Sequence, residues 1–105
     1  MKSPFFYAVT LNPCLDVNCY VRNLAFEDVI RIEKKTVLPG GKGFNVAKSL
    51  ERLGDNVVSI GLKGGRNGVI LFDLLGRAGL RKSVPVNVAG EIRENYNFFL
   101  PTDAC

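Results

Sequence analysis

The stretch that decides the fold of this 105-residue chain is Pro39-Gly40-Gly41-Lys42-Gly43-Phe44-Asn45-Val46-Ala47. Its closely spaced glycines predict a loop over residues 38–43, because such a stretch favours neither a regular helix nor a regular strand. From Phe44 the apolar residues recur on one face at helical spacing, and Gly54 supplies a stop signal. The stretch therefore predicts a glycine-rich loop that leads directly into a helix.

Apolar runs on both sides of this unit predict strands. Residues 5–11 (FFYAVTL) form a β-rich apolar run that ends at Asn12-Pro13, which predicts a buried first strand. Residues 56–62 (NVVSIGL) predict a second such strand, and a second glycine loop over 64–68 then precedes a helix over roughly 69–78. Strand, glycine loop and helix in repeated order predict an α/β fold with a parallel sheet and flanking helices.

Four further segments predict additional strands. Residues 17–22 and 30–33 alternate between apolar and polar, which is typical of a sheet with one wet face. Two more strand-like runs cover 84–88 and 95–100. The sequence ends shortly afterwards, before any helix that could cover the last strand, and a parallel sheet needs both faces covered. We therefore expect the parallel sheet to be incomplete.

The composition indicates one soluble globular domain. Hydrophobic residues make up 47% and charged residues 23% of the chain, which excludes disorder as the main state. The net charge is +4, and the only adjacent basic pairs are Lys34-Lys35 and Arg81-Lys82. This scatter argues against a nucleic-acid partner, which would require a basic face or stripe. A mild positive excess suits anionic small molecules, phosphates among them.

The histidine and cysteine content limits the chemistry. The chain has no His, which excludes Ser-His and Cys-His catalysis and imidazole-dependent zinc sites within it. Cys14, Cys19 and Cys105 form neither an even disulfide set nor a metal spacing, and we expect Cys14 and Cys19 to be small buried hydrophobes. No segment approaches ~20 apolar residues, and no signal-peptide core is present. We therefore expect a cytoplasmic protein with no metal site and no membrane partner.

The first glycine loop offers candidate binding groups for an anionic or hydroxyl-rich ligand. Gly40 and Gly41 allow backbone amides to approach a ligand closely, and the helix that follows presents its positive N-terminal end. Lys42 adds a mobile positive charge, and Asn45 adds an amide one step into the helix. The alternative is that the glycines only make a tight turn and that Asn45 caps the helix. That alternative is the more frequent one for an arbitrary glycine-rich turn.

Two charged residues outside the loop are further candidates. Asp16 follows the first strand, near the sheet end where α/β proteins bind ligands, and its carboxylate can accept hydrogen bonds from sugar hydroxyls. Its alternative role is capping or a surface turn. Arg93 lies between Glu91 and Glu94, so its default role is a solvated ion pair, whereas a bidentate phosphate contact is the alternative. The glycine loop at 64–68 either approaches a ligand or simply turns.

Together these stretches resemble the amino-terminal part of the PfkB (ribokinase-like) carbohydrate kinases. The Thr-Leu-Asn-Pro opening is similar to the 1-phosphofructokinase and tagatose-6-phosphate kinase branch. The resemblance implies that residues 1–105 form the sugar-binding and lid part of such a kinase: the start of a ribokinase-like sheet with flanking helices, plus a β lid with strands near 17–38 and 84–100. The segments that carry it, in the expected order, are 10–16, 39–47, Leu53-Gly54, Gly64-Gly65 to Gly68, and Arg93-Glu94-Asn95.

The resemblance also implies roles for residues of this chain. The parent activity is ATP-dependent and Mg²⁺-dependent phosphorylation of a hydroxyl on a phosphorylated ketohexose. The positions that match sugar-binding residues are Asp16, Gly40, Gly41, Lys42 and Asn45, and the position that matches a phosphate-binding residue is Arg93.

The sequence departs from the family pattern in one large respect. The family's catalytic Asp lies in a downstream Gly-Ala-Gly-Asp motif, which this sequence does not contain. The nucleotide site lies in the same missing part, so we expect neither an ATP site nor a Mg²⁺ site to be complete in this chain. We therefore expect no kinase activity from it alone. The alternative is a truncated, non-catalytic protein that binds sugar phosphate or associates, with itself or another chain, through exposed lid strands.

Overall fold

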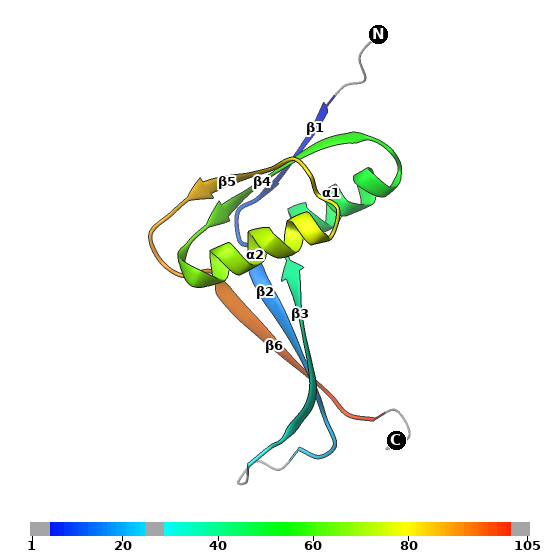
Figure 1. Ribbon diagram of the computed structural model, residues 1–105, viewed down its shortest axis with the longest axis vertical. Coiled ribbons are helices and arrows are strands. Elements are labelled where there is room, and N and C mark those ends of the chain that lie inside the picture. The colour runs from blue at the N-terminus through cyan, green and yellow to red at the C-terminus, as the bar shows by residue number, and fades with distance from the viewer. Residues whose placement is uncertain (1–4, 25–28, 102–105) are drawn as a thin grey trace.

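The computed structural model describes residues 5–24 and 29–101. These residues form two three-stranded sheets, with helices packed on one of them. In Figure 1 the helices lie against the first sheet, and the second sheet extends away from them. The strand orders are β1-β4-β5 and β3-β2-β6. The elements are β1 (Phe5–Thr10), β2 (Cys14–Val21), β3 (Ile32–Gly40), α1 (Lys42–Arg52), β4 (Asn56–Lys63), α2 (Gly65–Arg77), β5 (Ser83–Asn87) and β6 (Arg93–Phe99).

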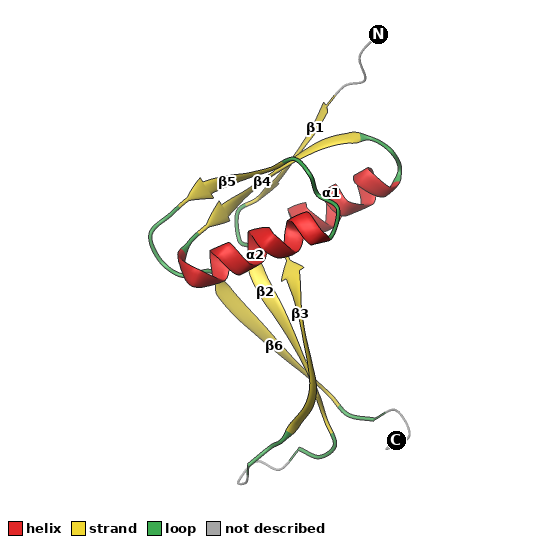
Figure 2. Ribbon diagram, in the orientation of Figure 1, coloured by secondary structure: helices red, strands yellow, loops and turns green. Residues whose placement is uncertain are grey.

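The first sheet is parallel, as the sequence predicts. Strand β4 pairs with β1 from Phe5↔Asn56 onward and with β5 on its other side. Helices α1 and α2 cover one face of this sheet (Figure 2). Phe44 of α1 is fully buried and lies over Gly61, where a Cβ atom would collide with its ring. The buried core cluster is Ala8, Leu15, Phe44, Ala47, Val57, Leu71, Leu75, Leu80 and Ile92.

Strand β1 is only partly buried, which corrects the prediction of a buried first strand. Ala8 and Thr10 face the helices and are buried. Phe5, Tyr7 and Val9 point to the opposite face and are exposed. The reason is that α1 and α2 both pack on one face, whereas no described helix packs on the second face. The predicted α/β class with a parallel sheet and flanking helices is confirmed.

The second sheet contains most of the segments expected in the lid. Strand β2 pairs antiparallel with β3 and parallel with β6, from Cys14↔Arg93 to Tyr20↔Phe99. Part of the expected lid, residues 25–28, lies outside the described residues, as does Cys105. The expected lid strand at 84–88 is wrong, because β5 pairs with β4 in the parallel sheet. Helix α2 forms the crossover that returns the chain parallel to β4.

The glycine-rich stretch is more regular than predicted. We expected a loop over 38–43, but β3 continues through Leu38-Pro39-Gly40 and α1 begins at Lys42. Pro39 is tolerated because β3 is an edge strand, where a missing N–H group can face away from the ladder. The turn is confined to Gly41, whose φ of 136° is accessible to glycine and strained for other residues.

Helix α2 begins at Gly65, four residues earlier than the predicted start near Val69. The second glycine loop therefore belongs largely to the first turn of this helix. A Cβ at Gly64 would collide with the carbonyl oxygen of Gly90, and one at Gly65 would collide with the carboxylate of Glu91. These glycines make room for the chain's own segment rather than for a ligand. In the described part of the chain, no helix is long and apolar enough to cross a membrane.

Candidate functional site

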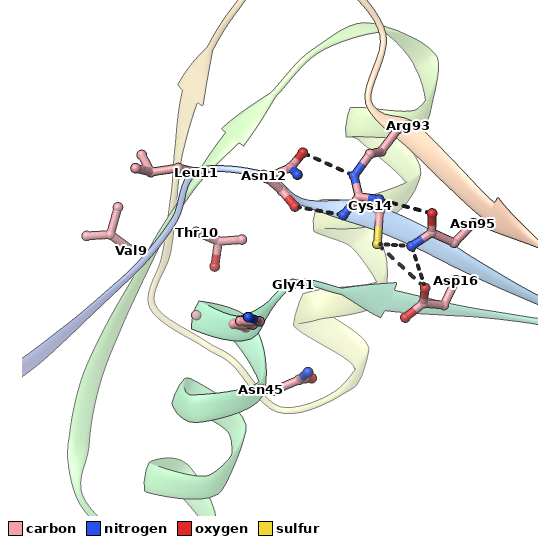
Figure 3. Close-up of a pocket in the computed structure, with 12 residues that line it drawn as sticks. Val9, Thr10, Leu11, Asn12, Cys14, Asp16, Gly41, Asn45, Arg93 and Asn95 are labelled. Carbon is pink, nitrogen blue, oxygen red and sulfur yellow. Dashed lines mark hydrogen bonds between the residues drawn. The ribbon is translucent and has the colours of Figure 1, made fainter.

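A cavity of about 520 Å³ lies where the end of β1, the N-terminus of α1 and the first residues of β2 and β6 meet (Figure 3). It brings together residues about eighty positions apart in the sequence. The lining residues are Val9, Thr10, Leu11, Asn12, Cys14, Asp16, Gly41, Lys42, Gly43, Asn45, Arg93 and Asn95.

Most of the residues predicted from the sequence line this cavity, and Gly40 does not. Gly40 is buried at the end of β3, where it pairs with Cys14 of β2. A Cβ at this position would lie 2.6 Å from Oδ2 of Asp16. The glycine therefore lets β3 pass close to the Asp16 carboxylate. The predicted residues that do line the cavity are Asp16, Gly41, Lys42, Asn45 and Arg93.

The N-terminus of α1 opens toward the cavity. Gly41 is its N-cap residue and has no side chain that could accept a hydrogen bond from the first turn. The hydroxyl of Thr10 lies beside Gly43, is buried, and has no hydrogen-bond partner among the described residues. Free backbone N–H groups at a helix N-terminus favour an anion or a polar oxygen. The end of α1 is therefore suited to a ligand, which favours the ligand-binding interpretation of this loop over that of a simple turn.

Gly43 permits the close packing of α1 on β1, and its replacement by alanine should destabilise the fold. A Cβ at Gly43 would lie 2.6 Å from the carbonyl oxygen of Val9 and would also collide with the Thr10 hydroxyl. We expect Gly43→Ala to lower the free energy of unfolding by about 1–3 kcal/mol, because overpacking forces backbone shifts. Urea unfolding followed by circular dichroism measures this change.

The matched control for this substitution is Gly76→Ala in α2. A Cβ at Gly76 meets nothing within 4 Å, so alanine gains helix propensity without a clash. We expect Gly76→Ala to raise the free energy of unfolding by about 0.5–1 kcal/mol. Close packing at Gly43 would be disproved if both variants changed stability in the same direction.

Arg93 is held by two asparagines on opposite sides of its guanidinium. Its Nε donates to Oδ1 of Asn12 at 3.0 Å, and one Nη donates to Oδ1 of Asn95 at 3.0 Å. The other Nη lies 3.5 Å from the backbone carbonyl oxygen of Asn12. These neutral partners fix the guanidinium at the cavity, and among the described residues no carboxylate forms a salt bridge with it.

The default prediction for Arg93, a solvated ion pair with its acidic neighbours, is wrong. Glu91 accepts hydrogen bonds from the backbone N–H groups of Arg66 and Asn67 at the start of α2. Glu94 accepts from the side chains of Asn67 and Tyr96, and these hydrogen bonds hold the pKa of Glu94 below its usual value of 4.5. Alternate residues of a strand point to opposite faces, so Glu94 and Arg93 point apart.

Asp16 lies in a small network on β2 and β6. Its Oδ1 accepts a hydrogen bond from the Cys14 thiol at 3.5 Å and one from Nδ2 of Asn95 at 3.4 Å. Asn95 also donates to the Cys14 sulfur at 3.4 Å. Burial, followed by the nearby negative charge of Asp16, raises the pKa of Cys14 above its usual 9.0. Cys14 therefore stays protonated at neutral pH and acts as a hydrogen-bond donor rather than as a nucleophile.

Sequence reasoning missed Asn12, Asn95 and Thr10 as members of the site. Asn12 and Asn95 stand in the motifs that carry the resemblance, but no role was assigned to them. The period-two alternation of β6 offered a usable signal, because Asn95 must share a face with Arg93. Cys14 and Cys19 are both buried, as predicted.

The cavity does not fit a Mg²⁺ site by itself. Asp16 is the only carboxylate among its lining residues. Across residues 5–24 and 29–101, no group of three or more His, Cys, Asp or Glu side chains could hold a metal ion. Mg²⁺ needs oxygen ligands in near-octahedral geometry, commonly with one or two carboxylates and the phosphates of a nucleotide.

Residues 8–97 match the family model described as pfkB family carbohydrate kinase. The chain belongs to the pfkB family. The structure is also similar to that of phosphofructokinase-2 from Escherichia coli in complex with fructose-6-phosphate, with a TM-score of 0.83 and 28% identity, over 93% of this chain and 32% of that chain. It is similar to a protein described as a possible 1-phosphofructokinase from Thermotoga maritima, with a TM-score of 0.77 and 33% identity, over 97% of this chain and 33% of that one.

These comparisons confirm the family resemblance and the ribokinase-like α/β fold predicted from the sequence. The chain spans about a third of the length of the phosphofructokinases that it matches. The matched residues, 8–97, include strands of both sheets, both helices and the residues that line the cavity.

Proposed function

We propose that this chain supplies the sugar-phosphate-binding part of an ATP-dependent sugar-phosphate kinase, whose substrate is a phosphorylated ketohexose. The observation that carries the proposal is the pairing, around one cavity, of a carboxylate suited to hydroxyls with cations suited to a phosphate. The similarity to a phosphofructokinase in complex with fructose-6-phosphate supports this substrate class.

Each lining group has a part in binding the ligand. Asp16 accepts hydrogen bonds from sugar hydroxyls, and Asn45 at the start of α1 offers an amide that both donates and accepts. Arg93 binds the phosphate through its planar guanidinium, which suits bidentate contact with phosphate oxygens. Lys42 and the open N-terminus of α1 add positive potential on the other side of the cavity.

The chain alone is proposed to position the sugar phosphate without transferring a phosphoryl group. Phosphoryl transfer requires a base or an aligned nucleophile, together with stabilisation of the charge on the transferred group. The sequence has no Gly-Ala-Gly-Asp motif, whose Asp the family resemblance identifies as the base for the attacking hydroxyl. The sheet β3-β2-β6 is proposed to act as a lid that excludes water from the bound sugar. The cytoplasmic location stays a prediction.

Thermal unfolding in the presence of ligand tests this proposal. We expect fructose 6-phosphate or fructose 1-phosphate to raise the Tm of the chain, since a ligand at a hundred times its Kd stabilises by about 2.7 kcal/mol. Fructose without a phosphate is the control and should have a much smaller effect. Two results would contradict the proposal: no shift with either sugar phosphate at millimolar concentration, or ATP turnover by the chain that depends on added sugar phosphate.

A second candidate function, association through the lid sheet, is favoured by the exposed aromatic side chains on β6. Tyr96, Phe98 and Phe99 are each between 44% and 53% exposed, and β6 is an edge strand. Edge strands with apolar side chains pair readily with another chain. Sedimentation equilibrium should then show a concentration-dependent dimer that Phe98→Lys weakens; a monomer at all concentrations would exclude this candidate.

A further inference from the structure

The N-terminus of α2 is tied to β6 by a cluster of side chains outside the cavity, which we call the α2–β6 clamp: Asn67, Glu91, Glu94 and Tyr96. Glu91 accepts hydrogen bonds from the backbone N–H groups of Arg66, at 3.2 Å, and of Asn67. A carboxylate at this end of a helix is favoured both by the free N–H groups and by the helix dipole. Gly65 leaves space for that carboxylate because it has no Cβ.

Asn67 contacts the residues on both sides of Arg93. Its Nδ2 donates to the backbone carbonyl oxygen of Ile92 at 2.9 Å and to Oε1 of Glu94 at 2.9 Å. The backbone N–H of Ile92 also donates to the carbonyl oxygen of Gly64 at 3.3 Å. Tyr96 donates to the other oxygen of Glu94. Hydrogen bonds to the start of α2 therefore fix the chain at Ile92, just before β6, and at Glu94, the second residue of the strand.

The residues of β6 that belong to the clamp and those that line the cavity lie on opposite faces of the strand. Arg93 and Asn95 pair with Cys14 and Asp16 of β2 and line the cavity. Glu94 lies between them in sequence and points toward α2, where it contacts Asn67. A shift of β6 relative to α2 would therefore move Arg93 relative to the N-terminus of α1. A binding group must be held to within about 0.5 Å of its productive position to be effective.

We propose that Asn67 and Glu91 are positioning residues, which hold Arg93 in place to bind the phosphate of the ligand. This inference rests on the proposed function, because it takes the ligand of Arg93 to be a sugar phosphate. The clamp acts on phosphate affinity through Arg93, whereas Asp16 is held mainly by its own strand β2, which also pairs with β3.

A double-mutant cycle tests whether Asn67 acts through Arg93. Titration calorimetry with fructose 6-phosphate measures the Kd of the wild type, Asn67→Ala, Arg93→Ala and the double variant. We expect Asn67→Ala to raise the Kd roughly tenfold in the wild-type background and to have almost no further effect once Arg93 is alanine. Equal effects in both backgrounds, or none in either, would overturn the inference, because a purely structural role is additive.

Two further variants complete the design. Glu91→Gln keeps the shape of the clamp and removes its charge, so it should raise the Kd in the same Arg93-dependent way even where Asn67→Ala fails to fold. Asn87→Ala, an exposed residue at the end of β5, is the matched control and should leave the Kd unchanged.

A measurement without ligand separates failure of this inference from failure of the proposed function. The Nε–H of Arg93 donates to Asn12 and should give a protected ¹H–¹⁵N signal in the free wild-type chain. Loss of this signal in Asn67→Ala supports the clamp even where no sugar phosphate binds. An unchanged signal in Asn67→Ala would overturn the clamp, whether or not the chain binds the ligand.

Discussion

Asp16→Ala should remove most of the sugar-phosphate-dependent stabilisation of this chain. Among the described residues that line the cavity, Asp16 has the only carboxylate, and hydrogen bonds to a charged group contribute about 1.5–3 kcal/mol each. The loss of contacts to two hydroxyls should raise the Kd for fructose 6-phosphate at least roughly a hundredfold. Titration calorimetry and the ligand-induced shift in Tm both measure this effect.

The control for this substitution is Asp73→Ala. Asp73 lies on the exposed side of α2, where it forms a salt bridge to Arg77, and does not line the cavity. Its replacement removes the same charge and should leave the Kd unchanged. Tighter binding in Asp16→Ala would show that the carboxylate only repels the phosphate, and unchanged binding would show that the sugar lies elsewhere.

Phe44→Ala should leave the chain largely unfolded at 25 °C. The ring of Phe44 is fully buried between α1 and the parallel sheet, and it packs edge-to-face on Phe72 with 6.2 Å between ring centroids. Removing a buried Phe side chain costs about 3–5 kcal/mol. Small domains have about 5–15 kcal/mol in total, and this parallel sheet is covered on one face only by the described residues. Because the described residues leave one face of the sheet bare, we place this chain near the lower end of that range, where a loss of about 3–5 kcal/mol removes most of the stability.

Far-UV circular dichroism and the dispersion of the NMR spectrum measure the folded fraction of this variant. Val46→Ala, on the same helix but 54% exposed, is the control and should change the free energy of unfolding by no more than about 0.5 kcal/mol. A Phe44→Ala chain with wild-type dispersion and a Tm lowered by only a few degrees would contradict the central role of this side chain.

The parallel sheet and its helices could be predicted because their signals are local. Apolar runs near 5–11 and 56–62, followed by glycines and helical periodicity, required no knowledge of tertiary contacts. The partner of β5 could not be predicted in this way, since its short run is compatible with either sheet. In the structure, α2 carries the chain back across the sheet, and β5 pairs with β4.

The start of α2 shows why local propensity misplaces boundaries. Gly65 and Gly68 lower helix propensity, which favoured a helix that starts near Val69. In the structure the first turn is stabilised by Glu91, whose carboxylate accepts hydrogen bonds from backbone N–H groups 24 and 25 residues earlier in the chain. A contact between residues so far apart in the sequence is absent from any local pattern.

Members of the candidate site could be predicted where a charged side chain stands in a family motif. The charges of Asp16, Lys42 and Arg93 drew attention to residues that line the cavity. Asn12 and Asn95 were missed, because their roles depend on the pairing of β6 with β2 across about eighty residues of sequence.

We propose that this chain, which spans about a third of the length of the phosphofructokinases that it matches, holds sugar-phosphate-binding groups around one cavity. Titration of the ¹⁵N-labelled chain with fructose 6-phosphate, followed by ¹H–¹⁵N NMR, tests it most directly. We expect saturable shift changes concentrated at Asp16, Lys42, Asn45 and Arg93, with little change on the exposed face of β1. A spectrum unchanged at millimolar ligand, or changes centred on the β5 edge of the parallel sheet, would contradict it.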